Sequence, residues 1–173
     1  MVSVDGHRQA APGELERVRE LLNTWLVPND TRVPTDNLAE FCAARGLGTA
    51  EADTIRALRD DLRSVIEQPA DAEGLLADWS ASTALRPVLS QGRLAFAHDG
   101  GLAAELLAAV FSAAAAGRLR RLKACPDCRW VFYDHTRNGR KRWCLMYAGG
   151  PEGRACGTIA KVRTYRQRHP GTA

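Results

Sequence analysis

Four cysteines in the last third of the chain decide the expected fold, in the segments ACPDC (residues 124–128), RWC (142–144) and RACG (154–157). Only two residues separate Cys125 from Cys128, so both thiolates can reach one metal ion from a tight turn. Fifteen residues then separate Cys128 from Cys144, and eleven separate Cys144 from Cys156. This spacing predicts a metal site built from two halves, as in a zinc ribbon or a treble-clef-like site.

The ligand set favours a structural zinc ion. Four soft thiolates prefer zinc or an iron–sulfur cluster, and four cysteines close the coordination sphere and leave no open position for catalysis. A segment of about 45 residues has too small a core to fold unaided, so a metal is expected to hold it. Three alternatives remain at this point: an iron–sulfur cluster, four unrelated free cysteines, and His135 or His169 in place of Cys156.

The residues around the cysteines suggest a small supporting structure. Residues 129–134 alternate like a short strand, with Trp130 and Phe132 as a miniature core. Residues 158–168 carry apolar side chains at helical spacing, and we expect Ile159, Val162 and Tyr165 to pack on the metal core. The cationic side chains of that helix then face outward.

The charge of the chain is divided unevenly. Residues 117–173 contain 14 Lys and Arg against 3 Asp and Glu, whereas residues 1–116 contain 10 against 17. A basic tail on an acidic body suggests a polyanionic partner, although a solvated basic face or the balancing of a thiolate-rich metal site would also use arginines. The candidate nucleic-acid contacts are Arg140, Lys141, Arg142, Lys161, Arg163, Arg166 and Arg168.

The first 116 residues predict a mostly helical domain. Helices are expected over residues 13–26, 36–45, 49 to about 69, from 71 onward, and 101–116, with Gly117 as the stop of the last one. Residues 85–89 and 94–97 flank a turn and predict an antiparallel hairpin. The fold class is therefore mostly α (α+β): a helical N-terminal domain with a small hairpin, followed by a four-cysteine zinc module with a basic helix.

Several function classes find no support in the sequence. There is no run of about 18 apolar residues and no secretory signal, so we expect a cytoplasmic protein without a membrane partner. Cys42 lies among apolar residues and is expected to be buried rather than nucleophilic. No phosphate loop, catalytic triad or metalloprotease pair is present, so we expect no enzymatic activity.

The cysteine segments and their surroundings resemble the CGNR zinc-finger family of bacterial proteins. Its Cys-x-x-Cys, its aromatic strand and its Arg-x-Trp-Cys-like turn correspond to Cys125–Cys128, residues 132–134 and residues 142–144. Its Cys-Gly and basic helix correspond to Cys156-Gly157 and residues 160–166. Two departures stand out: Thr158-Ile159 replaces the family's Asn-Arg, and the segment before Cys156 is longer.

The resemblance implies a division into an ABATE-like domain (residues 1–117), suggested by the "LNT" at residues 22–24, and a CGNR-type zinc-finger domain (residues 118–173). Members of the family are described as stress-induced transcription regulators. The resemblance thus implies a zinc-containing, DNA-binding regulator whose N-terminal domain senses a small molecule or a partner. An adaptor held together by zinc that binds protein or RNA is the main alternative, and an enzyme with an N-terminal pocket is the weakest.

Overall fold

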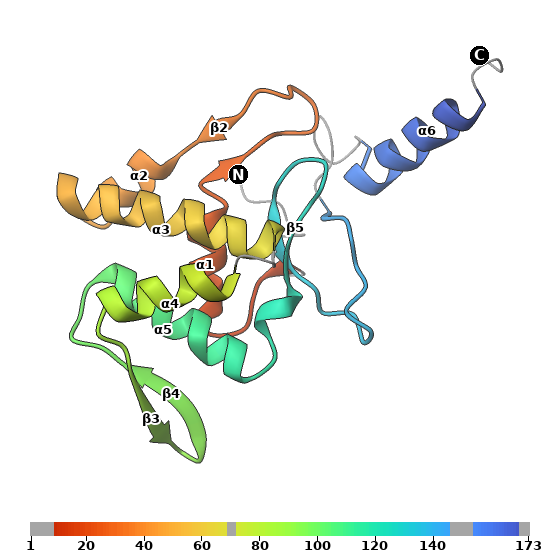
Figure 1. Cartoon of the computed structure of the whole chain (residues 1–173). Helices are drawn as coiled ribbons and strands as arrows, with labels where there is room; N and C mark the ends of the chain where they lie inside the picture. The colour runs from red at the N-terminus through yellow and green to blue at the C-terminus, as the bar shows by residue number, and fades with distance from the viewer. Residues whose placement is uncertain (1–8, 69–71, 146–153, 170–173) are drawn as a thin grey trace.

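The computed structural model describes residues 9–68, 72–145 and 154–169 (Figure 1). Its helices are α1 (Leu15–Leu22), α2 (Leu38–Ala43), α3 (Thr49–Glu67), α4 (Ala72–Ser82), α5 (Leu102–Ala115) and α6 (Cys156–Arg168). Its strands form antiparallel pairs: β1 (Trp25–Leu26) with β2 (Thr35–Asp36), β3 (Arg86–Ser90) with β4 (Arg93–Ala97), and β5 (Leu122–Ala124) with β6 (Val131–Tyr133). A 3-10 turn at Leu119–Arg121 leads from α5 into β5. The predicted fold class, mostly helical with small antiparallel hairpins, is confirmed.

The main core lies where α1, α3 and α5 meet. Each helix contributes apolar side chains spaced three or four residues apart, which places them on one face. The β5–β6 pair closes the same core from the zinc-binding end of the chain, so the metal module and the helices share buried surface. The shared core includes Leu15, Val18 and Leu22 of α1, Ile55, Leu58 and Leu62 of α3, Leu106, Leu107 and Val110 of α5, and Leu122, Val131 and Tyr133 of the strands.

The first two helices are shorter than the sequence suggested. The helix expected over residues 13–26 ends at Leu22, because the chain turns at Asn23 and Trp25–Leu26 pair with β2 instead. The Asn23 side chain supports this turn by bonding both backbone groups of Val131 on β6, at 2.7 and 2.9 Å. The second helix begins at Leu38, where Asp36 accepts the backbone N–H at 3.0 Å.

The remaining elements follow the sequence closely. The β3–β4 hairpin turns at Gln91 and Gly92, which both have positive φ angles of 50° and 71°. A two-residue turn of this kind matches the natural twist of paired strands. Gly117, at φ +66°, ends α5 as expected, since it is in the left-handed region that favours glycine. The expected start of the fourth helix at Asp71 lies outside the described residues.

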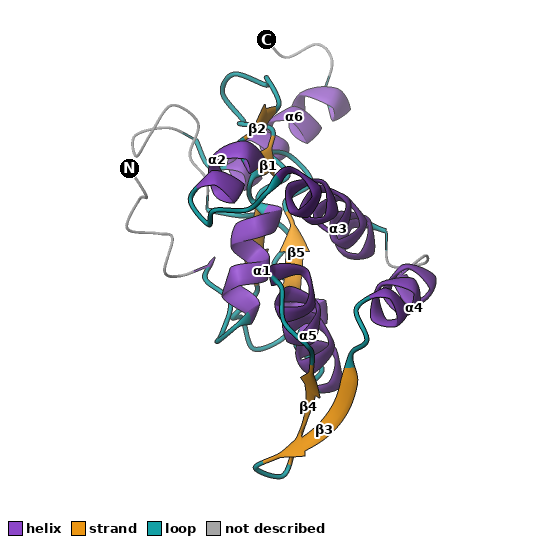
Figure 2. Cartoon of the chain, turned by 90° about the vertical axis from the view of Figure 1, so that its left-hand side faces the viewer, coloured by secondary structure: helices purple, strands orange, loops and turns teal. Residues whose placement is uncertain are grey.

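The hairpin and α6 both extend away from the core. Figure 2 shows the β3–β4 arm projecting beyond α5, and Figure 1 shows α6 standing apart from the other helices. Among the residues that the structure describes, no helix has the length and apolar character needed to cross a membrane.

Candidate metal centre

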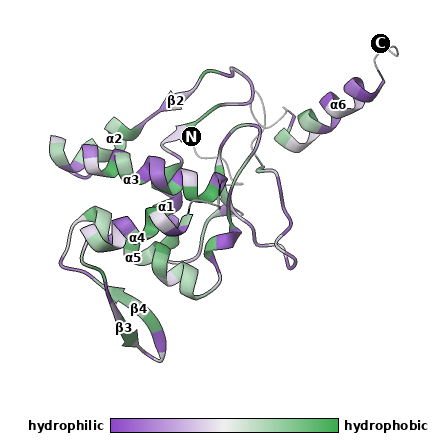
Figure 3. Cartoon of the chain, viewed as in Figure 1, coloured by the Kyte–Doolittle hydropathy of each residue, from purple (hydrophilic) through white to green (hydrophobic). Residues whose placement is uncertain are grey.

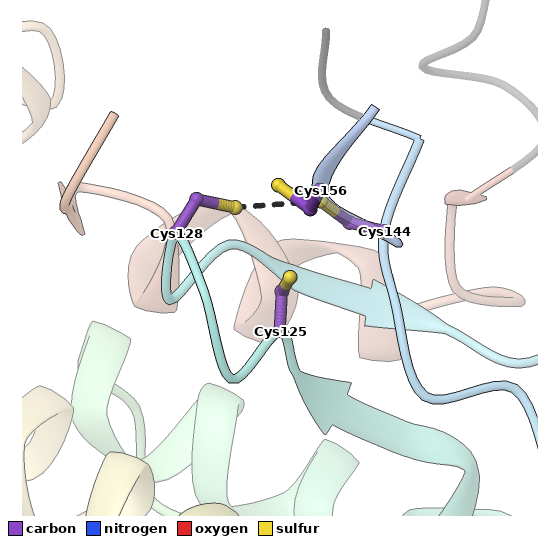
Figure 4. A group of neighbouring side chains, drawn as sticks. All are labelled: Cys125, Cys128, Cys144 and Cys156. Atoms are coloured by element: carbon purple, nitrogen blue, oxygen red, sulfur yellow. Dashed lines mark hydrogen bonds between the residues drawn. The ribbon is translucent and has the colours of Figure 1, made fainter. Parts of the chain in front are cut away.

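Three separate pieces of backbone bring the four cysteines together. Cys125 follows β5 directly, and a tight turn returns the chain so that the Cys125 N–H bonds the carbonyl of Trp130 at 2.9 Å. Cys128 lies within that turn. Cys144 ends the loop that leaves β6, and Cys156 is the first residue of α6. Figure 4 shows the four side chains converging.

The geometry of the sulfur atoms fits a tetrahedral ion. All four Sγ atoms lie within 4.8 Å of one another, and all four residues are buried. The Cys144 and Cys156 sulfurs are 3.7 Å apart, and those of Cys128 and Cys144 are 3.3 Å apart. Bonds of about 2.3 Å to one zinc ion would place such sulfurs about 3.8 Å apart. A disulfide, which needs about 2.05 Å, is excluded for these pairs.

Cys156, rather than a histidine, completes the site. Its sulfur lies inside the cluster, whereas the His135 ring bonds the carbonyl of Ala10 at 2.7 Å. His169 lies at the far end of α6, where its ring stacks on that of Tyr165. Four thiols, rather than three thiols and a histidine, therefore form the candidate site.

The close approach of the sulfurs shifts the pKa values of three of the thiols in opposite directions. Hydrogen bonding from Cys128, followed by Cys144 and Cys156, lowers the pKa of the Cys125 thiol far below its usual range. The same contact with Cys125 raises the pKa values of Cys144 and Cys156. A bound divalent cation removes this conflict, because thiolates bind the metal and their protons are released.

A loop from the N-terminal part of the chain covers the metal centre. This clasp loop, residues 27–32, places the Asn29 amide 3.0 Å from the Cys156 sulfur. Its Arg32 guanidinium bonds the Asp127 carbonyl at 3.1 Å and the Asp127 carboxylate at 2.9 Å. Bonds from outside groups orient metal ligands and raise metal affinity. The clasp loop thus has the geometry of an outer support for the site.

Asp134 orders the loop that carries Cys144. Its side chain is fully buried and accepts the Lys123 ammonium at 2.8 Å and the backbone N–H groups of Thr136 and Lys141 at 2.9 and 2.8 Å. Burial, the largest single influence, raises the pKa of this carboxyl, but the bonds from Lys123, Thr136 and Lys141 together bring it well below 3.8. Asp134 therefore holds residues 134–141 in a defined path as an ionised group.

Packing at the start of α6 explains the glycine after Cys156. A Cβ atom on Gly157 would lie 3.2 Å from the ring of Trp143, closer than side chains normally approach. Trp143 and Trp130 are only half-buried and pack against the cysteine cluster. The Cys-Gly pair thus lets the first turn of α6 lie directly against the indole ring.

One expectation about α6 is wrong. Tyr165 does not pack on the metal core, because it is 59% exposed, and Ile159 and Val162 are only half-buried. Cys156 is the one buried residue that α6 contributes over its described length. The helix therefore leaves the metal centre instead of folding back across it.

The candidate nucleic-acid contacts lie on two sides of α6 and on the preceding loop. Arg163 and Arg166 line one hollow beside the helix, together with Arg154. Lys161 and Arg168 line another with Trp143. Arg140, Lys141 and Arg142 form a separate group near Arg129 on the loop before Cys144.

Sequence reasoning missed Arg154 beside α6 and Asn29 beside the metal centre. Arg154 could have been included because it lies two residues before a ligand. Asn29 gave no signal, since it is 127 residues from the cysteine that it contacts. Arg163 is also less free than expected, because its guanidinium lies 3.8 Å from the Asp127 carboxylate.

Comparison with known proteins agrees with the metal site. No curated protein matches the chain in a sequence search. Residues 121–169, which include all four cysteines and α6, match the family described as CGNR zinc finger.

Proposed function

We propose that the protein is a DNA-binding transcription regulator in which zinc holds α6 as a cationic arm, while the N-terminal part senses a ligand or a partner. The observation that carries the proposal is the anchoring of α6. Its first residue is a buried metal ligand, and the rest of the helix projects with Lys161, Arg163, Arg166 and Arg168 exposed (Figure 1). A rigid helix that presents cations suits the DNA phosphates and the edges of bases.

The chemistry of the site supports a structural role for the metal. Four thiolates would hold zinc without an open coordination position, so the ion supplies folding energy rather than a Lewis-acid centre. A site of this kind needs reduced cysteines, and all five cysteines, which lie within the described residues, are buried thiols outside any disulfide. We propose that the protein works in the reducing cytoplasm, and four-thiolate coordination supports a structural rather than a catalytic role for the metal.

The test is the binding of a fluorescent 20-base-pair duplex, measured by anisotropy at several salt concentrations. In the Arg163→Gln/Arg166→Gln variant, we expect weaker binding and a salt slope smaller by about two units, since each phosphate contact releases about one counterion. Arg45→Gln/Arg56→Gln, just after α2 and on α3, is the matched control with the same change in charge. Equal affinities and slopes for wild type and the α6 variant would remove the arm from the interface.

RNA and protein are the competing partners. A zinc-held adaptor that prefers RNA would bind a single-stranded RNA of equal length more tightly than the duplex, because RNA recognition favours unstacked bases. An adaptor for proteins would bind neither nucleic acid in a salt-dependent way. Either result would replace DNA as the partner.

A further inference from the structure

A large groove lies on the side of the molecule away from the metal centre. It has a volume of about 900 Å³ and runs between the β3–β4 arm, the C-terminal half of α5 and the start of α1. This volume lies within the range of ligand-binding pockets, about 300–1,000 Å³. None of the zinc-binding cysteines lines it.

The walls of the groove are apolar. The α5 wall presents small side chains, among them Ala109, Ser112 and Ala116, so the space beside the helix stays open. The opposite wall carries Leu94 and Phe96 of β4. Figure 3 shows both strands of the arm coloured mostly as hydrophobic. Phe96 packs on Phe111 at 5.3 Å between ring centroids, whereas Leu94, nearer the tip, remains 46% exposed.

The charged residues of the groove leave an excess of positive charge. Both acidic side chains, Glu14 and Glu105, bind Arg17, at 3.4 and 2.7 Å. Arg93 lies at the tip of the arm and Arg118 lies just beyond the end of α5, and both side chains line the groove. In the described ranges, neither guanidinium has an ion pair. An apolar body with a negative head would therefore find complementary partners here.

We propose that this groove binds an amphipathic anion, a small molecule with an aromatic or aliphatic body and a carboxylate or sulfonate head. Its body lies between Leu94 and the small residues of α5, and its head contacts Arg93 and Arg118. The proposal names a ligand class for the N-terminal part and rests on the sensing role proposed above. It is distinguishable from nucleic-acid binding, because the groove shares no residue with the cationic arm.

The test uses two fluorescent probes with the zinc-loaded full chain. 1-Anilinonaphthalene-8-sulfonate carries an anionic head, and N-phenyl-1-naphthylamine has the same rings without it. We expect the sulfonate probe to bind more tightly than the neutral probe. Arg93→Gln/Arg118→Gln should weaken the affinity for the sulfonate about three- to tenfold and change the affinity for the neutral probe by less than about twofold. Ser112→Phe fills the groove and should weaken both probes. Arg86→Gln/Arg120→Gln removes two arginines from the same segments outside the groove and should change neither.

The outcomes separate the alternatives. The proposal would be overturned if Arg93→Gln/Arg118→Gln and Arg86→Gln/Arg120→Gln weakened sulfonate binding equally, or if neither weakened it. In either case the charge of Arg93 and Arg118 would not select the ligand. A dimer by light scattering that disappears in Ser112→Phe, with sulfonate binding unaffected, would show that a second copy fills the groove. Sulfonate binding that leaves duplex affinity unchanged would keep the groove as a ligand site but refute the proposed sensing. Lost duplex binding with intact probe binding would refute only the function of α6.

Discussion

Replacement of Asp134 by asparagine should destabilise the metal module by about 3 kcal/mol, the sum of two lost hydrogen bonds. The amide is nearly isosteric, so the change tests charge and hydrogen bonding rather than volume. One side of the carboxylate accepts Thr136, and the oxygen of the introduced amide can preserve that contact. The other side accepts Lys123 and the Lys141 N–H at 2.8 Å each, and there an amide NH₂ would face two donors.

The magnitude follows from the two donors that lose this oxygen as their acceptor. A buried donor without a partner costs about 1–3 kcal/mol. The loss costs less for the Lys123 ammonium than for the Lys141 N–H, because Lys123 also bonds the carbonyls of Gly139 and Lys141. The Lys123 side chain is 26% exposed, so we expect the loss of its ion pair to cost less than the breaking of a fully buried ion pair, which costs about 3–5 kcal/mol. Urea unfolding of the zinc-saturated proteins at pH 7, followed by tryptophan fluorescence, measures the difference.

The control is Asp99→Asn, which removes an exposed carboxylate 2.7 Å from the exposed Arg86. We expect it to cost little, as exposed pairs do. The pKa of Asp134 is lowered from 3.8, so the difference between wild type and Asp134→Asn should be complete above pH 3.8 and decline as the pH falls through the folded pKa. A cost at pH 7 no larger than that of the control would refute the role given to Asp134.

Two further predictions concern the metal and the clasp loop, and a third concerns the Asp36–Arg59 ion pair. Cys144→Ser should lose the zinc content of about one ion per chain, measured by atomic absorption, while Cys42→Ser should keep it because Cys42 lies outside the cluster. Asn29→Ala should lower zinc affinity about 10–100-fold in competition with a chromogenic chelator, because Cys156 loses its amide contact. The hydrogen bond from the buried Arg59 is the main cause that lowers the pKa of Asp36. The titration of the Asp36 carboxyl carbon by NMR should therefore have a midpoint below 3.8. A midpoint at 3.8 or above would show that this pair does not form in solution.

The sequence predicted the metal ligands because their signal is local. Cys125 and Cys128 lie in one turn, and thiolates have few other uses at that spacing. The same applies to the hairpin and to α5, where the turn residues and Gly117 mark the boundaries. These features depend on neighbours along the chain, which a sequence displays directly.

The supporting contacts could not be predicted because they join distant segments. Asn23 ends α1 partly by pairing with Val131, 108 residues away, so periodicity alone extended that helix too far. The sequence also did not reveal that α6 points away from the metal core. Ile159, Val162 and Tyr165 have the helical spacing that is typical of a packed face. Their actual exposure is decided by where Cys156 must lie to reach the metal.

The attachment of α6 by one end makes the arm behave mechanically as a cantilever. Thirteen residues span about 20 Å at 1.5 Å per residue. A tilt of about 10° at Cys156 would therefore displace the far end by roughly 3 Å, about the length of one hydrogen bond. The Asn29–Cys156 contact lies at the fixed end, where a small shift is amplified along the helix toward Arg166 and Arg168, and the Arg163–Asp127 contact holds α6 about half-way along its length. The positions of the Arg166 and Arg168 side chains thus depend on how firmly the N-terminal end of α6 is held at Cys156.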